Sequence, residues 1–335
     1  MAKANRLALS MLVVLSLAAA AAAQSYTVTD LGPGQAFAIN SLGDVAVQQY
    51  PSGNSFIWAP DGSILTLLPL PGDSSASPSG INSQGLAVGT SGTLNGTSAV
   101  LWTNGVPLDL GTLGGTTSSA TGINASGEVV GYSTLPSRAT EAFVWTKETG
   151  MQGLGFLPGG GYSFADAINR YGQVAGYATT NGDAIANAFL WSKTTGMKNL
   201  GKLPGSVNSA GIAINDLGQV AGYSDCGTGC AHAVLWSKAK GSILDLGVLP
   251  GAISSYARGI NNVGQVVGLV YYSPVGNHLH AFVWSPSTGM LDLNKLIPAN
   301  SGWVLQSANA INDQGQIVGL GMLNGQNEAF LLTPQ

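Results

Sequence analysis

Charged residues are scarce in this chain of 335 residues. Asp, Glu, Lys and Arg make up 8% of the sequence, whereas an ordinary globular domain has about a quarter. The 12 basic and 16 acidic side chains give a net charge of −4. A surface that binds nucleic acid needs clustered Lys and Arg to neutralise phosphates. The composition therefore argues against a nucleic-acid partner.

Long apolar runs are absent except near the N-terminus. Lys3 and Arg6 precede the apolar segment Leu7–Leu17, and a run of alanines ends at residue 23. This pattern is typical of a cleaved secretory signal peptide, because the apolar segment is short for a membrane span of about 20 residues. A retained membrane anchor is the alternative. With residues 1–23 assigned to the signal peptide, we expect a secreted protein (extracellular, periplasmic or at the cell surface) with a net charge of about −6 and no membrane insertion.

Cysteine and histidine are rare, with two and three residues. Cys226 and Cys230 occur in DCGTGC, where the Gly-Thr-Gly segment allows the two Cβ atoms to approach. Because an exported chain meets oxidising conditions, a disulfide is the preferred interpretation; a metal site of both thiols and His232 is the alternative. His278 and His280 alternate on one strand without a third ligand. We therefore expect neither a metal nor a cofactor.

Glycine is abundant, with 48 residues, and one phrase is repeated. GINASGEVVGYS begins at Gly122, and AINRYGQVAGYA and AINDLGQVAGYS begin at Ala167 and Ala213. Ile-Asn with Gly three residues after the Asn occurs seven times, 42 to 51 residues apart. The asparagines are Asn40, Asn82, Asn124, Asn169, Asn215, Asn261 and Asn312. A period of about 40–50 residues with short β-like segments is typical of β-propeller blades, each a four-stranded sheet.

Each unit contains four strand-like segments, lettered a to d from the propeller axis outward. Segment a ends at the Ile-Asn pair, and segment b follows the Gly. Segment c ends at an aromatic position that six units fill with Trp, and segment d precedes LPG or LGG. Asn-x-x-Gly suits a tight hairpin turn between segments a and b. The Trp residues recur once per unit, so we expect them to pack in the core.

The two ends of the repeat array complement each other. The last unit stops after segment c, at Leu332, whereas Tyr26–Gly32 (YTVTDLG) resembles a segment d with no a, b or c before it. If the first strand completes the last blade, the ring closes and no sheet edge is left open. We therefore predict an all-β, seven-bladed β-propeller whose N-terminal strand closes the last blade, as a single domain over residues 24–335.

The repeat resembles a known family of extracellular proteins. His280-Ala281-Phe282, followed by Val-Trp, together with DLGTLGG from Asp109 and GQVVG from Gly264, is similar to the HAF-repeat family. The resemblance extends over all seven units. It implies a secreted or surface-located β-propeller, and it assigns no catalytic residue to this chain.

No catalytic constellation stands out in the sequence. Glycosidases work with paired carboxylates, but Asp166 is the only acid in a segment a, and the equivalent residue of the sixth unit is Arg258. Both residues are predicted to point near the axis. Four further acids share one place in segment d, which is expected at the outer edge: Asp30, Asp109, Asp245 and Asp292. A catalytic site is therefore not indicated.

Aromatic residues give two candidate binding surfaces. Tyr132, Tyr177 and Tyr223 end segment b in three consecutive units, which is compatible with a platform for sugar rings or with packing at the sheet edge. The sixth unit has the longest b–c connection and a long insertion before the seventh unit. Its candidate residues for a distinctive binding surface are Tyr271, Tyr272, His278, His280 and Trp303.

These features favour a secreted binding or interaction module, expected to be a monomer, for an unidentified protein or glycan. Cell-envelope and carbohydrate ligands are the first to consider. The alternative is a secreted carbohydrate-active hydrolase or lyase with its site in the axial funnel, and a structural surface component is the third interpretation. The funnel distinguishes them: an enzyme needs two converging acids, whereas a binding module needs aromatic and polar residues.

Overall fold

The computed structural model describes residues 25–335 except 94–95, 228, 238–241 and 274–277. The predicted signal peptide and part of the long b–c connection of the sixth unit lie outside the described residues. The described residues are all-β, with one short 3-10 helix, η1 (Leu293–Lys295). None of them forms a helix that is long and apolar enough to cross a membrane.

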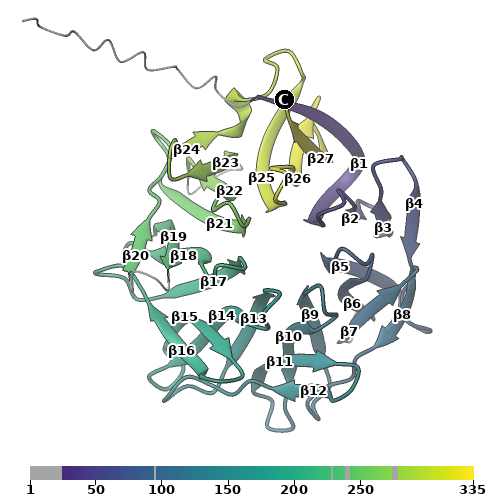
Figure 1. Cartoon of the computed structure of the whole chain (residues 1–335), viewed down its shortest axis with the longest axis vertical. Helices are drawn as coiled ribbons and strands as arrows, with labels where there is room; N and C mark the ends of the chain where they lie inside the picture. The colour runs from purple at the N-terminus through teal and green to yellow at the C-terminus, as the bar shows by residue number, and fades with distance from the viewer. Residues whose placement is uncertain (1–24, 94–95, 228, 238–241, 274–277) are drawn as a thin grey trace, which may run out of the picture.

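Five antiparallel sheets have four strands each and are arranged radially around a central axis (Figure 1). From the axis outward, their strands are β5 (Ser75–Ile81), β6 (Ala87–Thr93), β7 (Gly96–Thr103), β8 (Val106–Asp109); β9 (Ser118–Ile123), β10 (Val129–Thr134), β11 (Thr140–Thr146), β12 (Gly150–Gly153); β13 (Ser163–Ile168), β14 (Val174–Thr180), β15 (Ile185–Ser192), β16 (Gly196–Gly201); β17 (Ser209–Ile214), β18 (Val220–Asp225), β19 (Ala231–Ser237), β20 (Ser242–Asp245); and β21 (Ser254–Ile260), β22 (Val266–Tyr271), β23 (Leu279–Ser285), β24 (Gly289–Asp292).

The remaining sheet has seven strands and joins the two ends of the chain. Its order is β25 (Trp303–Ile311), β26 (Ile317–Leu323), β27 (Gln326–Pro334), β1 (Tyr26–Ile39), β2 (Val45–Gln49), β3 (Ser55–Trp58) and β4 (Ile64–Leu67). Strand β1 pairs with β27 from Tyr26 opposite Pro334 to Asp30 opposite Phe330, and its later residues pair with β2. The N-terminal segment thus pairs with the last segment c, as predicted.

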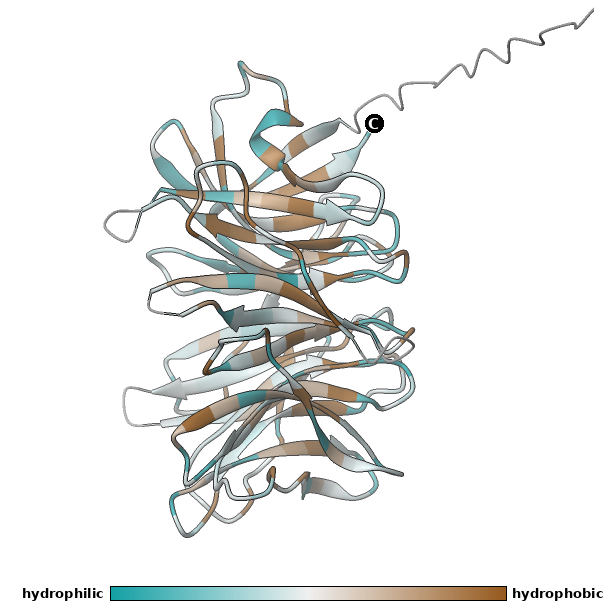
Figure 2. Cartoon of the chain, turned by 90° about the vertical axis from the view of Figure 1, so that its left-hand side faces the viewer, coloured by the Kyte–Doolittle hydropathy of each residue, from teal (hydrophilic) through white to brown (hydrophobic). Residues whose placement is uncertain are grey.

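The apolar core of the described residues is divided into seven clusters that lie between neighbouring units. One cluster, for example, joins Val130 and Ala142 of the third unit to Val174 and Phe189 of the fourth. Apolar residues lie along the strands, whereas the connecting loops are mostly polar or neutral (Figure 2). Of the six Trp that end segment c, four are buried, which confirms the core interpretation for Trp102, Trp145, Trp236 and Trp284.

The repeated asparagines form a closed circle around one end of the axis, which we call the asparagine circle. Within its own turn, Asn169 Oδ1 accepts hydrogen bonds from the backbone N–H groups of Tyr171 and Gln173. Its Nδ2 donates to the backbone carbonyl of Asn215 in the next unit, at 3.0 Å. The other six asparagines repeat this contact, and Asn312 donates to the carbonyl of Asn40 at 3.1 Å. Each side chain therefore stabilises both a turn and the contact between two units.

Tyr26, the first residue of β1, contains a buried hydroxyl without a hydrogen-bond partner among the described residues. Burial also raises the pKa of Tyr26 to about 12. An unsatisfied buried polar group costs about 1–3 kcal/mol. We therefore expect Tyr26→Phe, which keeps the ring, to increase the free energy of unfolding in urea by about 1 kcal/mol at pH 7. Tyr26→Ala, as the control, should lower it by about 3 kcal/mol or more; a less stable Phe variant would contradict this account.

Candidate functional site

The innermost strands of all units line a cavity of about 540 Å³ on the axis, which we call the axial cavity. Its walls come from β1, β5, β9, β13, β17, β21 and β25. The volume lies within the range of about 300–1,000 Å³ that is typical of small-ligand sites. The residues that line this cavity are therefore the first candidates for a functional site.

A β-bulge occurs at the same place in every innermost strand, three residues before the repeated asparagine. A bulge inserts one residue into a strand and re-aims its side chain. The bulged residues all line the axial cavity, and no two are of the same type: Phe37, Ser79, Thr121, Asp166, Ile212, Arg258 and Asn309. The next residue is always Ala or Gly, and the one after it is always Ile. The repeat thus keeps the scaffold constant and varies the cavity wall.

Asp166 on β13 is the only acidic residue among those that line the axial cavity. The side chain is half-buried, but its Oδ2 atom is fully enclosed and has no hydrogen-bond partner among the described residues. Desolvation by the surrounding groups raises the pKa of Asp166 from 3.8 to about 8. The carboxyl is therefore mainly protonated at pH 7, and in that form it donates a hydrogen bond rather than carrying a charge.

Arg258 on β21 is the only basic residue among those that line the axial cavity. It keeps contact with solvent and makes no hydrogen bond or ion pair with a described residue. Desolvation lowers the pKa of Arg258 below its usual value, while Tyr271 and Tyr223 oppose that change. The guanidinium nevertheless stays charged at neutral pH. The structure thus places Asp166 and Arg258 on the axis, as predicted, but not as an ion pair.

Two groups of three aromatic rings lie next to the residues that line the axial cavity, although none of the six residues lines the cavity itself. The first group is Tyr132, Phe164 and Tyr177, and the second is Tyr223, Tyr256 and Tyr271. Within each group, ring centroids lie 4.9–5.6 Å apart, and all six residues are half-buried. Burial, and then the charge of Asp166, raises the pKa of Tyr177 to about 12; burial likewise raises the pKa of Tyr223, with Tyr256 and Asp166 contributing further. Both aromatic groups therefore border Asp166.

The first two units have polar residues, Gln35 and Ser77, at the strand position that Phe164 occupies in the fourth unit. Gln35 and Gln48 face each other across β1 and β2. Gln48 Nε2 donates to Ser77 Oγ at 2.6 Å, and Asn309 Nδ2 donates to the carbonyl of Ala36 at 2.8 Å. Aromatic groups thus lie beside the cavity in the third to sixth units, whereas amides and hydroxyls lie beside it in the first, second and seventh.

In the structure, the candidate residues of the sixth unit contact different neighbours. Tyr271 belongs to the second aromatic group, whereas the ring of Tyr272 contacts that of His280 at 5.0 Å. His280 Nδ1 also lies 2.9 Å from Asp292 Oδ2. Trp303 packs against Phe330 of the last unit, and His278 is exposed. Of the five, Tyr271 alone belongs to the two aromatic groups that border the axial cavity.

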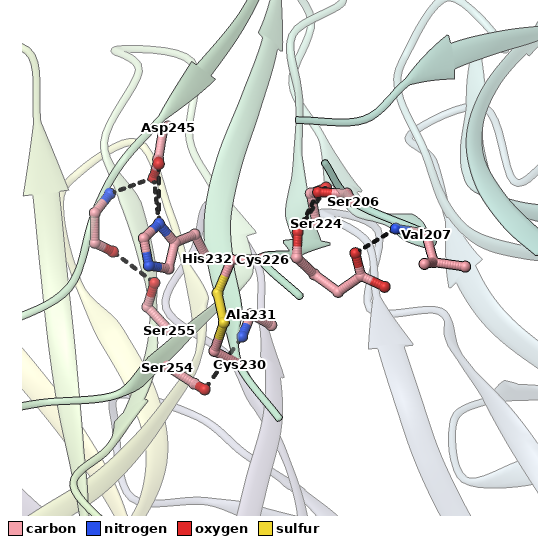
Figure 3. Close-up of a disulfide and its surroundings, with 12 residues drawn as sticks. Ser206, Val207, Ser224, Cys226, Cys230, Ala231, His232, Asp245, Ser254 and Ser255 are labelled. Atoms are coloured by element: carbon pink, nitrogen blue, oxygen red, sulfur yellow. Dashed lines mark hydrogen bonds and ion pairs between the residues drawn. A yellow bond between two sulfur atoms is a disulfide. The ribbon is translucent and has the colours of Figure 1, made fainter. Parts of the chain in front are cut away.

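The two cysteines form the predicted disulfide, Cys226–Cys230 (Figure 3). Beside it, His232 Nδ1 lies 3.0 and 2.9 Å from the two carboxylate oxygens of Asp245. Both sulfur atoms are thus in the disulfide, and His232 is paired with a carboxylate. In the part of the chain that the structure describes, no three His, Cys, Asp or Glu side chains are grouped so that they could hold a metal ion.

The remaining acids of segment d lie far from the axis. Asp109, Asp245 and Asp292 end the outermost strands β8, β20 and β24, as predicted. Among the residues that line the axial cavity, Asp166 therefore has no second carboxyl beside it. The residues that line the axial cavity thus provide one carboxyl group, whereas most glycosidases use two.

Comparisons with known proteins identify the architecture. No family model matches the chain, and no curated protein matches it in sequence. A virginiamycin B lyase from Staphylococcus aureus superposes with a TM-score of 0.59 at 12% identity, over 92% of this chain and 99% of that one. An oligogalacturonate lyase from Vibrio parahaemolyticus superposes with a TM-score of 0.58 at 11% identity, over 93% and 91%. This chain has a β-propeller fold. Identities this low carry the fold and not the activity.

Proposed function

We propose that this protein is a secreted, seven-bladed β-propeller of the HAF-repeat type that binds a carbohydrate in its axial cavity. The blade number is supported by the seven hydrophobic clusters between units, the seven members of the asparagine circle and the seven bulges. In this count β1 serves twice, as the outermost strand of the last blade and the innermost strand of the first.

Secretion is supported by the N-terminal sequence and by the Cys226–Cys230 disulfide. Disulfides persist in oxidising compartments and are rare in the cytosol. The apolar segment near the N-terminus has the length and the small-residue ending of a signal peptide. We therefore place the domain of residues 24–335 outside the cytoplasm.

The aromatic groups on one side of the axis and the amides and hydroxyls on the other carry the carbohydrate assignment. A sugar ring has an apolar face of C–H groups and an edge of hydroxyls. The aromatic groups offer partners for the apolar face, and the side with Gln35, Gln48 and Ser77 offers hydrogen-bonding groups for hydroxyls.

A carbohydrate-active lyase or hydrolase at the same cavity is the second candidate. It is favoured by Asp166, because a carboxyl whose pKa is about 8 is suited to proton transfer near neutral pH. The propellers of similar fold include proteins named as lyases, among them one for oligogalacturonate. Release of products from a bound oligosaccharide would distinguish this candidate from binding alone.

A test of the proposal compares two tyrosines at opposite ends of the axis. Purified protein is screened against a glycan panel, and affinity for the best ligand is then measured for Tyr177→Ala and Tyr171→Ala. Tyr171 is 62% exposed and follows Asn169, at the end with the asparagine circle. We expect Tyr177→Ala to weaken binding by about tenfold, because it removes a ring from the aromatic side of the site, and Tyr171→Ala to leave it unchanged. Equal losses in both variants, or no glycan bound, would refute the assignment.

A further inference from the structure

The two charged residues of the axial cavity lack partners inside the protein. Arg258 makes no hydrogen bond or ion pair with a described residue, and Asp166 Oδ2 is enclosed without a hydrogen bond. Arg258 is exposed, whereas the enclosed Asp166 Oδ2 is an exception to the rule that buried polar atoms are hydrogen-bonded, and this exception calls for an explanation. From this geometry we infer that the carbohydrate bound in the cavity is a sugar acid, whose carboxylate pairs with the guanidinium of Arg258. This inference rests on the proposed function.

Arg258 and Asp166 do not neutralise each other. They come from the sixth and the fourth units, with Ile212 of the fifth unit between them along the ring of bulged residues. The raised pKa of Asp166 has desolvation as its cause, whereas a guanidinium close by would lower it. The positive charge of Arg258 is therefore available to a ligand.

The surroundings of Arg258 favour a carboxylate on a ring-shaped molecule. A guanidinium binds a carboxylate through two parallel hydrogen bonds. The phenols that interact electrostatically with Arg258 are Tyr271 and Tyr223, both in the second aromatic group. A sugar ring that lies on this group would bring a carboxylate at its edge toward Arg258. Placing the anion there also compensates the partial desolvation of the guanidinium.

Asp166 completes the recognition in its protonated form. A neutral carboxyl donates a hydrogen bond to a sugar oxygen, whereas an ionised one would repel a bound carboxylate. The titratable groups on the surrounding strands include Tyr132 on β10, Tyr177 on β14, Tyr223 and Asp225 on β18, and Tyr256 and Arg258 on β21. Asp225 accepts from the backbone N–H of Asn208, and Glu141 on β11 accepts from that of Gly155, each at 2.8 Å. Binding of the sugar acid should therefore weaken as the pH rises through about 8.

The experiment compares an acidic sugar with its neutral ester. The probes are galacturonate and glucuronate trisaccharides, their methyl esters, and a sulfated trisaccharide, each titrated calorimetrically into the wild-type protein at pH 6 and pH 9. We expect at least one uronate to bind about tenfold more tightly than its ester at pH 6, and this preference to shrink at pH 9. Sulfate should bind more weakly than carboxylate.

Three variants test whether the preference for uronate over its methyl ester arises in the axial cavity. Arg258→Gln should bind uronate and ester equally, and Arg258→Lys should keep part of the preference, since it retains the charge without the fork of donors. Asp166→Asn, which retains a hydrogen-bond donor, should keep the preference at both pH values. The matched control is Arg170→Gln, which removes a guanidinium paired with Asp216 at the end with the asparagine circle and should change nothing. Thermal unfolding checks that each variant is folded.

The outcomes separate the inference from the proposed function. Binding of the esters as tightly as the uronates by the wild-type protein overturns the sugar-acid inference and leaves carbohydrate binding intact. Sulfate bound as tightly as carboxylate overturns the choice of carboxylate. An undiminished preference in folded Arg258→Gln overturns the role of Arg258. Failure of every sugar, charged or neutral, to bind overturns the proposed function itself.

Discussion

Removing the N-terminal strand should strongly destabilise the protein. A chain that begins at Gly34 lacks the part of β1 that pairs with β27, from Tyr26 opposite Pro334 to Asp30 opposite Phe330. It also loses Tyr26 and Leu31, which are 0% and 7% exposed. Burying one large apolar side chain contributes about 1.5–3 kcal/mol, and a whole domain is stable by only about 5–15 kcal/mol. We therefore expect the thermal unfolding midpoint to fall by 10 °C or more, or cooperative unfolding to disappear.

Two controls test whether the lost β1–β27 pairing, rather than the shorter chain, causes the destabilisation. A chain that begins at Ser25 keeps all of β1 and should unfold like the full protein. A synthetic peptide of residues 25–32, added in excess to the truncated protein, should restore part of the lost midpoint, because it can pair with the exposed edge of β27. An unchanged unfolding midpoint after truncation would show that the β1–β27 pairing does not stabilise the ring.

The pairing of β1 with β27 was predictable because the repeat pattern at the two ends of the chain indicates it. The repeat array lacks one segment at its C-terminal end and has one extra segment at its N-terminal end. The strand that contains Tyr26 could therefore be matched with the strand that contains Phe330 from the sequence alone. The asparagine circle was only half predictable. The turn role of Asn follows from its spacing to Gly. Its Nδ2 bond, in contrast, reaches a carbonyl 42 to 51 residues away in six cases and 272 residues away for Asn312, so it depends on which units are neighbours.

The axial site, like the asparagine circle, was only partly predictable from the sequence. Asp166 and Arg258 could be placed near the axis because they occupy one position of the repeat. The bulge that turns them into the cavity, and the lack of an ion pair between them, depend on three-dimensional spacing. Phe164 and Tyr256 escaped notice because they lie on the innermost strands, whereas the sequence drew attention to the tyrosines that end segment b. The available signal for the cavity wall was the position three residues before the repeated asparagine, where the residue type varies although its neighbours hardly change.

The predicted surface of the sixth unit illustrates a different difficulty. Tyr271 and Tyr272 are adjacent in sequence, but successive side chains of extended backbone point to opposite faces. Tyr271 therefore contacts Tyr256, whereas Tyr272 contacts His280. Adjacent aromatic residues in a loop sequence thus do not define one surface until the register of the preceding strand is known.

The stability of the wild-type protein should fall between about pH 4 and pH 8 through Asp166. Its folded pKa of about 8 lies above the unfolded value of 3.8, so in this range the native state holds a proton that the unfolded state has released. The stabilising contribution is complete below pH 4 and is lost as the pH rises to 8. The full shift corresponds to roughly 5–6 kcal/mol; because water in the cavity solvates part of the charge, we expect about 2–3 kcal/mol.

Replacing Asp166 by Asn should remove this dependence, because the amide has a similar shape and carries no charge at any of these pH values. Free energies of unfolding in urea, measured from pH 4 to pH 9, should be similar for both proteins at pH 4 and higher for Asp166→Asn at pH 9. Asp109→Asn, at the exposed end of β8, should keep the wild-type slope. A wild-type slope retained in Asp166→Asn would mean that Asp166 is already ionised at neutral pH. The axial cavity would then contain a carboxylate that repels acidic sugars, so this measurement constrains the ligand as well as the fold.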